Sequence, residues 1–176
     1  MSSRLPDFVD PWHFADVGKE VSGRVKLLEM PRLAKLLADS DGEAEFIFSF
    51  QRGEKKRVHI TGTVRAQLVL ECQRCMYAVN YQVNNEINLV VVEGSLEAEQ
   101  LPDKYDPLLA EDNRIRLQDV VEEELLLAMP QVPMHAESEC TKADQNMVQP
   151  HKAAGEGETS EPNPFAVLAE LKRKQT

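Results

Sequence analysis

The sequence feature that most constrains the fold is a long alternation of apolar and polar residues on both sides of ECQRC, Glu71 to Cys75. Before this pentapeptide, apolar residues occupy the even positions from Val64 to Cys72. After it, they occupy the odd positions from Tyr77 to Val91, with Asn85 as the one polar interruption. A period of two is typical of a β-strand with one buried face. The pattern therefore predicts a long hairpin with ECQRC at its tip.

The segment before this hairpin shows the same period over a shorter length. Apolar residues alternate with Glu45, Ile47 and Ser49 at Ala44, Phe46, Phe48 and Phe50. This pattern predicts a strand with an aromatic buried face, and a turn over 51–55 leads to a returning strand at Val58 and Ile60. Gly62 is expected to end that strand before the long one begins.

Two helices are predicted from apolar residues at helical spacing. The first covers Pro31 to Ala38, because Pro31 suits the first helical turn and three leucines follow on one side. The second covers 117–129 and ends at Pro130. Glu124 falls inside its apolar arc, and a solvated position at the edge of that arc is favoured over pairing with an arginine or lysine.

Two further segments lack a clear period. The opening stretch, to about Lys19, contains Pro6 and Pro11 and is expected to be extended. Its apolar residues, Phe8, Trp12 and Phe14, would pin it to the body of the protein. The acidic segment from Glu93 to Asn113 is too long for a tight turn and is interpreted as a surface excursion.

The C-terminal part changes character. Residues 136–162 are rich in Glu, Ser, Ala, Gly, Asn and Gln, which predicts a flexible acidic linker. An amphipathic helix is predicted over 163–176, with Asn163 as its N-cap and Pro164 at its first position. Its remaining features are an apolar stripe and a basic end, formed by Phe165, Leu168 and Leu171 and by Lys172 and Arg173. We interpret this helix as a docking device.

Together these patterns predict an α+β fold. It consists of a mainly antiparallel sheet with a long hairpin, two helices packed on one side, the flexible segment and the C-terminal helix. We expect a single domain over 1–135, the linker over 136–162 and the helix over 163–176.

Composition limits the functions that the chain can have. Its formal net charge is −10, which disfavours broad contact with a phosphate backbone, so any RNA contact must be local or pass through a protein. Arg65, Arg74 and the basic helix are the places where such a contact is expected. The chain has no apolar run of membrane-spanning length and no secretory signal, which predicts a cytoplasmic protein without a membrane partner. No motif for a small-molecule substrate is evident.

The three cysteines allow more than one interpretation. Cys72 and Cys75 have the spacing of two metal ligands on a tight turn, and His135 and Cys140 offer a second half, which gives a candidate zinc set. In the alternative interpretation, Cys72 is a core residue and the other two are incidental thiols. A redox pair fits less well, because thioredoxin-like cysteines lie at the start of a helix, whereas these lie between strands.

Three segments carry a resemblance to a known family. They are LECQRC, the stretch EEELLLAMP followed by VPMH, and NPFAVLAELKRK at the C-terminus. With LPDKYDP, they resemble the YceD family, the large ribosomal RNA subunit accumulation proteins formerly called DUF177. Some relatives carry further C-terminal cysteine pairs, whereas this sequence offers only His135 and Cys140, which therefore remain candidates.

The resemblance implies a non-catalytic role in ribosome biogenesis, through the synthesis, processing or stability of large-subunit ribosomal RNA. The expected partner is a precursor of that RNA or a ribosomal protein. Two other hypotheses stay open from the residues themselves. One is a metal- or thiol-dependent enzyme, and the other is an acidic carrier of a basic ribosomal protein.

Overall fold

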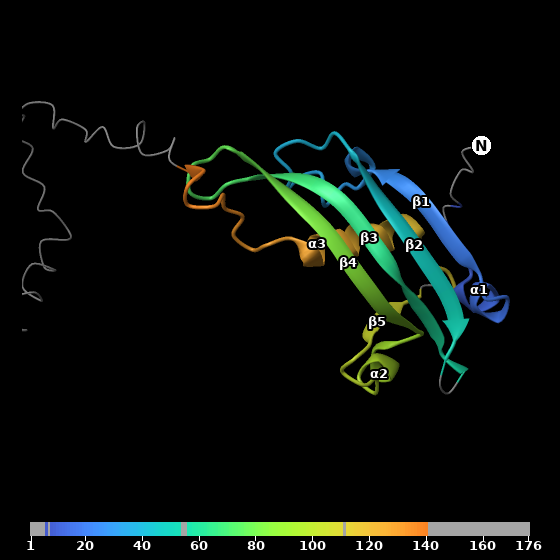
Figure 1. Cartoon of the computed structure of the whole chain (residues 1–176). Coiled ribbons are helices and arrows are strands. Elements are labelled where there is room, and N and C mark those ends of the chain that lie inside the picture. Colours follow the sequence, from blue (N-terminus) through green and yellow to red (C-terminus); the bar gives the residue numbers. More distant parts are fainter. Residues whose placement is uncertain (1–5, 7, 54–55, 111, 141–176) are drawn as a thin grey trace, which may run out of the picture. The chain divides into compact units, whose positions relative to one another are not determined.

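The protein is built around one five-stranded sheet (Figure 1). The structure is a computed structural model that describes residues 6, 8–53, 56–110 and 112–140. The strands follow the order β1 (Glu20–Lys26), β2 (Glu43–Arg52), β3 (Val58–Glu71), β4 (Ala78–Val92) and β5 (Asp106–Leu109). All neighbours are antiparallel except β4 and β5, which are parallel. The predicted α+β class with a mainly antiparallel sheet is confirmed.

The long hairpin is confirmed as β3 and β4, which pair from His59 opposite Val90 to Glu71 opposite Ala78. The predicted break at Gly62 is wrong, because β3 runs through it in regular register with Phe48 on β2. A Cβ at this position would lie 1.9 Å from the carbonyl oxygen of Ile47. The glycine therefore allows a close approach of two backbones without ending the strand.

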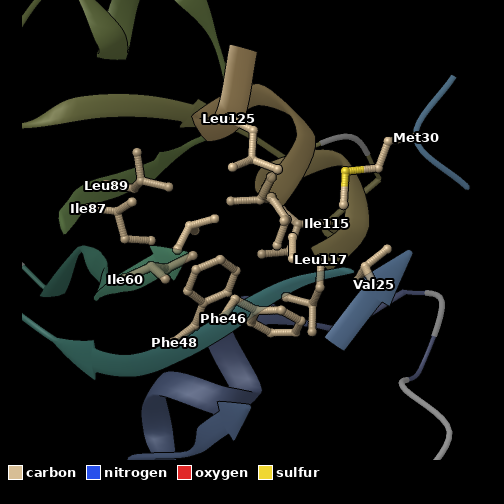
Figure 2. Packing of buried hydrophobic residues seen from close by; sticks show 14 of the residues in the cluster. Val25, Met30, Phe46, Phe48, Ile60, Ile87, Leu89, Ile115, Leu117 and Leu125 are labelled. Atoms are coloured by element: carbon tan, nitrogen blue, oxygen red, sulfur yellow. The ribbon is translucent and has the colours of Figure 1, made fainter. Parts of the chain in front are cut away.

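One face of the sheet forms the core. The aromatic strand is confirmed, and Phe46 and Phe48 are buried with their ring centroids 4.7 Å apart. Helix α3 (Leu117–Ala128) packs on this face and contributes buried Leu117 and Leu125, as Figure 2 shows. The alternation in the sequence therefore identified the buried face of the sheet, and the predicted helix supplies its cover.

The opening segment differs from its prediction. Residues Pro11–Asp16 form helix α1, where an extended run was expected. The Asp10 carboxylate accepts hydrogen bonds from the amides of Trp12 and His13, at 2.9 and 3.0 Å, and Pro11 stands at the first helical position. Asp-Pro was thus a helix start. Phe14 then packs edge-on against Phe50, with centroids 5.3 Å apart.

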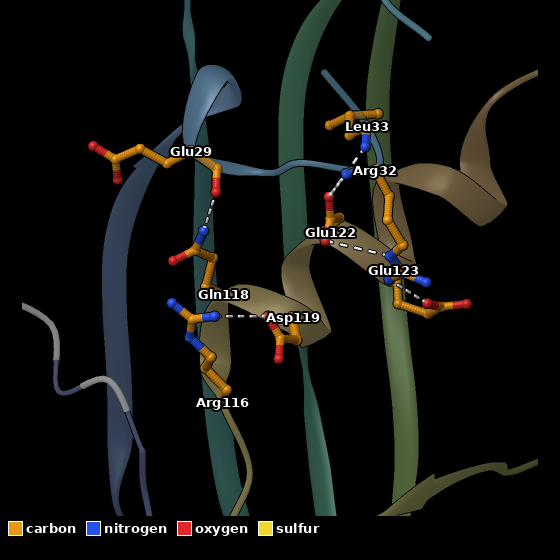
Figure 3. Close-up of polar contacts among 8 residues, drawn as sticks. All are labelled: Glu29, Arg32, Leu33, Arg116, Gln118, Asp119, Glu122 and Glu123. Carbon is orange, nitrogen blue, oxygen red and sulfur yellow. Dashed lines mark hydrogen bonds and ion pairs between the residues drawn. The ribbon is translucent and has the colours of Figure 1, made fainter. Parts of the chain in front are cut away.

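The helix predicted over Pro31 to Ala38 is wrong. A short 3₁₀ helix, η1 (Leu27–Glu29), is followed by turns over 31–36. In Figure 3, Glu122 of α3 reaches these turns, where its carboxylate oxygen accepts from the amides of Arg32 and Leu33 at 2.7 and 3.0 Å. A buried carboxylate from a distant helix satisfies these amides, so tertiary contacts override the local spacing.

The excursion after β4 is more ordered than its sequence indicated. It contains the short helix α2 (Ser95–Ala98) and the edge strand β5. Strand β5 has four residues, which are too few to show an alternation of apolar and polar side chains. The sequence pattern therefore did not predict it.

Glu124 is buried, so the prediction of a solvated edge residue is wrong. Its carboxylate accepts a hydrogen bond of 2.8 Å from the side-chain amide of Asn85, the polar interruption on β4. Burial and the nearby charge of Asp106 raise the pKa of Glu124, and the Asn85 hydrogen bond offsets part of that rise. The two polar departures from the apolar pattern are therefore partners.

The predicted linker and C-terminal helix lie largely outside the described residues. Residues 136–140 are described, and they form a turn that ends at buried Cys140. None of the helices in the described part of the chain is both long and apolar enough to span a membrane.

Candidate metal centre

The tip of the β3–β4 hairpin is a tight turn that carries two of the candidate ligands. The amide of Cys72 donates to the carbonyl of Tyr77 at 2.9 Å, and the amide of Met76 donates to the carbonyl of Cys72 at 2.8 Å. Met76 adopts a φ of 59°, in the left-handed region. This turn places the Cys72 and Cys75 sulfurs in one buried cluster.

The other two candidate ligands come from the segment that follows α3. The amide of Gln73 donates to the carbonyl of Pro133 at 2.9 Å, which fixes this segment against the hairpin tip. His135 follows, and its amide lies 3.4 Å from the Cys72 sulfur. The turn after His135 then returns Cys140 to the same cluster.

The four side chains have the spacing that a tetrahedral zinc ion requires. The Cys72 and Cys140 sulfurs are 3.7 Å apart, and His135 Nδ1 lies 3.3 Å from the Cys75 sulfur and 3.9 Å from the Cys140 sulfur. All four ligand atoms lie within 4.8 Å of one another. With Zn–S bonds of about 2.3 Å and Zn–N bonds of about 2.0 Å, tetrahedral geometry gives S–S and S–N separations of about 3.8 and 3.5 Å. The residues therefore fit a metal ion of this kind.

The orientation of His135 supports a ligand role. Its Nε2 lies 3.0 Å from the carbonyl oxygen of Ala78, the first residue of β4. A proton on Nε2 donates to that oxygen and leaves the lone pair of Nδ1 directed at the three sulfurs. Metal-bound histidines are commonly held by such a second contact.

The thiols differ in how readily they ionise. Burial raises the pKa of Cys72, but hydrogen bonds from the amides of His135, Arg74 and Cys75 outweigh it, so that the pKa is lowered well below its ordinary value. For Cys140, burial and its sulfur neighbours both raise the pKa. A thiolate is the form that binds metal, so the surroundings of Cys72 prepare it as a ligand better than those of Cys140 do.

This geometry bears on the alternatives for the cysteines. Three buried thiols and an imidazole nitrogen converge from segments more than 55 residues apart. Cysteines without a shared role would have no reason to meet in this way. The Cys72–Cys75 pair lies between two strands, without the helix start that lowers the pKa of the first cysteine in thioredoxin-like proteins. The arrangement favours a metal centre over a redox pair.

The two candidate arginines lie apart. Arg65 lies in the middle of β3, where its Nε donates to Asn84 Oδ1 at 2.8 Å. Arg74 is at the hairpin tip, where its guanidinium lies 3.7 Å from the Met134 sulfur. The six residue-to-residue steps along β3 from Arg65 to Glu71 alone span about 20 Å. The remaining candidates, Asn163, Pro164, Phe165, Leu168, Leu171, Lys172 and Arg173, lie outside the described residues.

Sequence reasoning missed the parts of the site that consist of backbone groups. The carbonyl of Ala78 and the amide of Gln73 position the two halves, and no side-chain pattern marks either. The sequence signals for the site were the short spacing between Cys72 and Cys75 and the end of the predicted helix at Pro130, shortly before His135.

Comparison with known proteins gives two findings. Residues 60–172 match the family described as "Large ribosomal RNA subunit accumulation protein YceD". A protein of that name from Haemophilus influenzae is 34% identical over 172 residues, which cover 97% of this chain and 98% of the relative. No solved structure gives a significant match.

Proposed function

This chain belongs to the YceD family of large ribosomal RNA subunit accumulation proteins, and we propose from this premise that it is a non-catalytic ribosome-biogenesis factor. It supports the synthesis, processing or stability of large-subunit ribosomal RNA in the cytoplasm. Its partner is a precursor of that RNA or a ribosomal protein. The observation that carries the proposal is the match to the Haemophilus influenzae relative over nearly the whole of both chains.

The geometry of the metal centre agrees with a role without catalysis. Three cysteines and one histidine fill all four positions of a tetrahedral ion, as in structural zinc sites, whereas catalytic zinc keeps a position open for water or substrate. When bound, zinc supplies a cross-link between the hairpin tip and the segment after α3.

Depletion of the protein in its own organism tests the function. We expect the amount of large-subunit ribosomal RNA to fall relative to small-subunit RNA, and re-expression of the protein to restore the ratio. Both RNAs are quantified in total RNA from the same cells. An unchanged ratio during growth in which the protein is normally present contradicts the proposal.

Zinc is the metal that we propose for Cys72, Cys75, His135 and Cys140. Protein purified without chelator should contain about one zinc ion per chain. The double variant Cys72→Ser, Cys75→Ser should contain none, because hydroxyl groups replace two thiolates. Full zinc occupancy in that variant would place the ion elsewhere.

The terminal segment is proposed as a contact with the partner. Helices of about 12 residues are marginal alone, so residues 163–174 should become helical on docking through Phe165 and Leu168. Replacing both with Ala should abolish co-sedimentation with large-subunit precursors and leave the melting temperature of the free protein unchanged. A marked fall in melting temperature with binding intact would assign the helix to the folded body.

A further inference from the structure

The hairpin tip carries a group of exposed apolar side chains around the metal centre. The exposed fractions are 54% for Met76, 56% for Tyr77, 56% for Val132 and 50% for Met134. With Arg74 they form what we call the tip surface. Single exposed apolar residues are common on proteins, whereas a cluster of them marks an interaction site.

Two contacts bring the segments that carry these residues together. The Gln73–Pro133 hydrogen bond sets the two segments side by side, and the Arg74 guanidinium lies against the Met134 sulfur. The candidate ligands adjoin these residues in the chain, because Cys75 precedes Met76 and His135 follows Met134. A metal ion in the centre would therefore hold both halves of the tip surface in place.

The backbone conformation of Met76 supports a role for this exposed methionine in binding. Its φ of 59° is uncommon for any residue except glycine, and a side chain that is half exposed gains little from burial there. Strained residues of this kind gather at binding sites, where the surrounding structure holds them. Methionine also adapts its shape to a partner, because its side chain is unbranched and polarizable.

The charges at the tip distinguish between kinds of partner. In the hairpin tip and the segment 132–140, the charged residues are Arg74 and three exposed carboxylates, Glu71, Glu137 and Glu139. Three negative charges against one positive repel a phosphate backbone, which RNA presents along its whole length. The same charges attract a protein segment rich in lysine and arginine.

We propose that the tip surface binds a basic protein segment that places an apolar side chain among Met76, Tyr77 and Met134. This inference rests on the proposed function and deepens it, because it assigns the partner at this surface to basic ribosomal protein in preference to RNA. Tyr77 acts as the central apolar anchor, and Glu137 and Glu139 pair with flanking cations. The metal centre then serves to build the surface.

Binding to purified components tests the proposal. The full chain is immobilised and exposed separately to the protein fraction of large ribosomal subunits, freed of RNA, and to large-subunit RNA freed of protein. Two double variants address the surface, Tyr77→Ala with Met134→Ala, and Glu137→Lys with Glu139→Lys. Their matched controls are Leu28→Ala with Leu127→Ala, exposed apolar residues outside the tip, and Glu99→Lys with Asp103→Lys, beside α2.

The expected result is that the wild type retains one or more defined proteins from the protein fraction. Retention should weaken about tenfold or more in both tip variants and stay unchanged in both controls, with zinc content and melting temperature equal in all five chains. Retained proteins that bind the tip variants as well as they bind the wild type overturn the proposal. So does retention of RNA alone, if a further variant, Arg74→Ala, abolishes it.

Two other occupants would also overturn it. One is a second copy of the chain, seen as a dimer that the tip variants dissociate. The other is the chain's own residues 163–174, seen as protection from protease in the wild type that the tip variants lose. A failure here differs from a failure of the proposed function, because tip variants that restore the ribosomal RNA ratio in depleted cells refute only the tip surface.

Discussion

The body of the protein and its hairpin tip are stabilised in different ways. Around Phe46 and Phe48, residues of β1 to β4 and α3 form a continuous apolar cluster. At the tip, three cysteines form a separate small cluster, and within the described part of the chain Val79 is the one partly buried apolar residue packed against it. The difference teaches that the body is held by burial of apolar surface, whereas the tip lacks enough of it and depends on specific ligands.

The largest effect is expected from breaking the body. Phe48→Ala removes a fully buried ring and should lower the free energy of unfolding by about 3–5 kcal/mol. Ile47→Ala is the matched control, because Ile47 is the preceding residue, faces the opposite side and is half exposed; its cost should stay near 1 kcal/mol or less. Denaturant unfolding measures both. Equal costs would show that the buried face does not dominate stability.

Breaking the tip should leave the body intact. Cys72→Ser is expected to abolish metal binding and to remove hydrogen-exchange protection over 132–140, because the two halves of the centre lose their cross-link. Protection of β2 and α3 should persist. Gln73→Ala is the control in the same turn, since its side chain donates to the carbonyl of Glu71 and belongs to neither half of the ligand set. A global loss of protection in Cys72→Ser would show that the two regions unfold as one unit.

A smaller effect is expected at the junction between α3 and the turns over 31–36. Glu122→Gln keeps an acceptor for the amides of Arg32 and Leu33 but removes the charge, which should cost about 1–2 kcal/mol. Glu123→Gln breaks only a half-exposed ion pair with Arg32 and should cost less than about 1 kcal/mol. Similar values for the two variants, from denaturant unfolding, would mean that burial of Glu122 adds nothing.

The smallest effect concerns Glu124 and depends on pH. Because the folded protein raises the pKa of this carboxyl, ionisation disfavours folding, and the penalty appears as pH rises from the ordinary value of 4.5 through the folded pKa. Glu124→Gln should therefore raise the melting temperature at pH 7, and this gain should vanish below pH 4.5. Glu123→Gln serves as the control. A gain that is independent of pH would exclude ionisation as its cause.

The body was predictable from sequence where the period was long. The alternation through Phe46, Leu68 and Leu89 gave the sheet and its buried face, because such a pattern has only one way to bury its apolar side. The prediction failed where a distant residue decides the local structure. The turns at Arg32 and Leu33 depend on Glu122, which is about 90 residues away.

The candidate centre was predictable in composition and not in geometry. The four residue types indicated a zinc set, but the hydrogen bonds from Gln73 to Pro133 and from His135 to Ala78 involve backbone carbonyls. Any residue supplies a carbonyl, so the sequence carries no trace of these contacts. The exposure of Met76, Tyr77 and Met134 likewise became visible only in three dimensions.

The separation in sequence between the two halves of the metal centre has a consequence for the order of folding. Strands β1 to β4 pair with their neighbours in the chain, so they form from local contacts and are expected to fold early. The centre instead joins Cys75 to His135, 60 positions later, and closing such a loop costs roughly 3–4 kcal/mol of chain entropy. At a synthesis rate of about 5–20 residues per second, Cys140 follows Cys75 by roughly 3–13 s. A newly made chain therefore pairs β3 with β4 before it can assemble the metal centre. Any partner that recognises the tip with its complete metal centre recognises only chains already synthesised beyond Cys140.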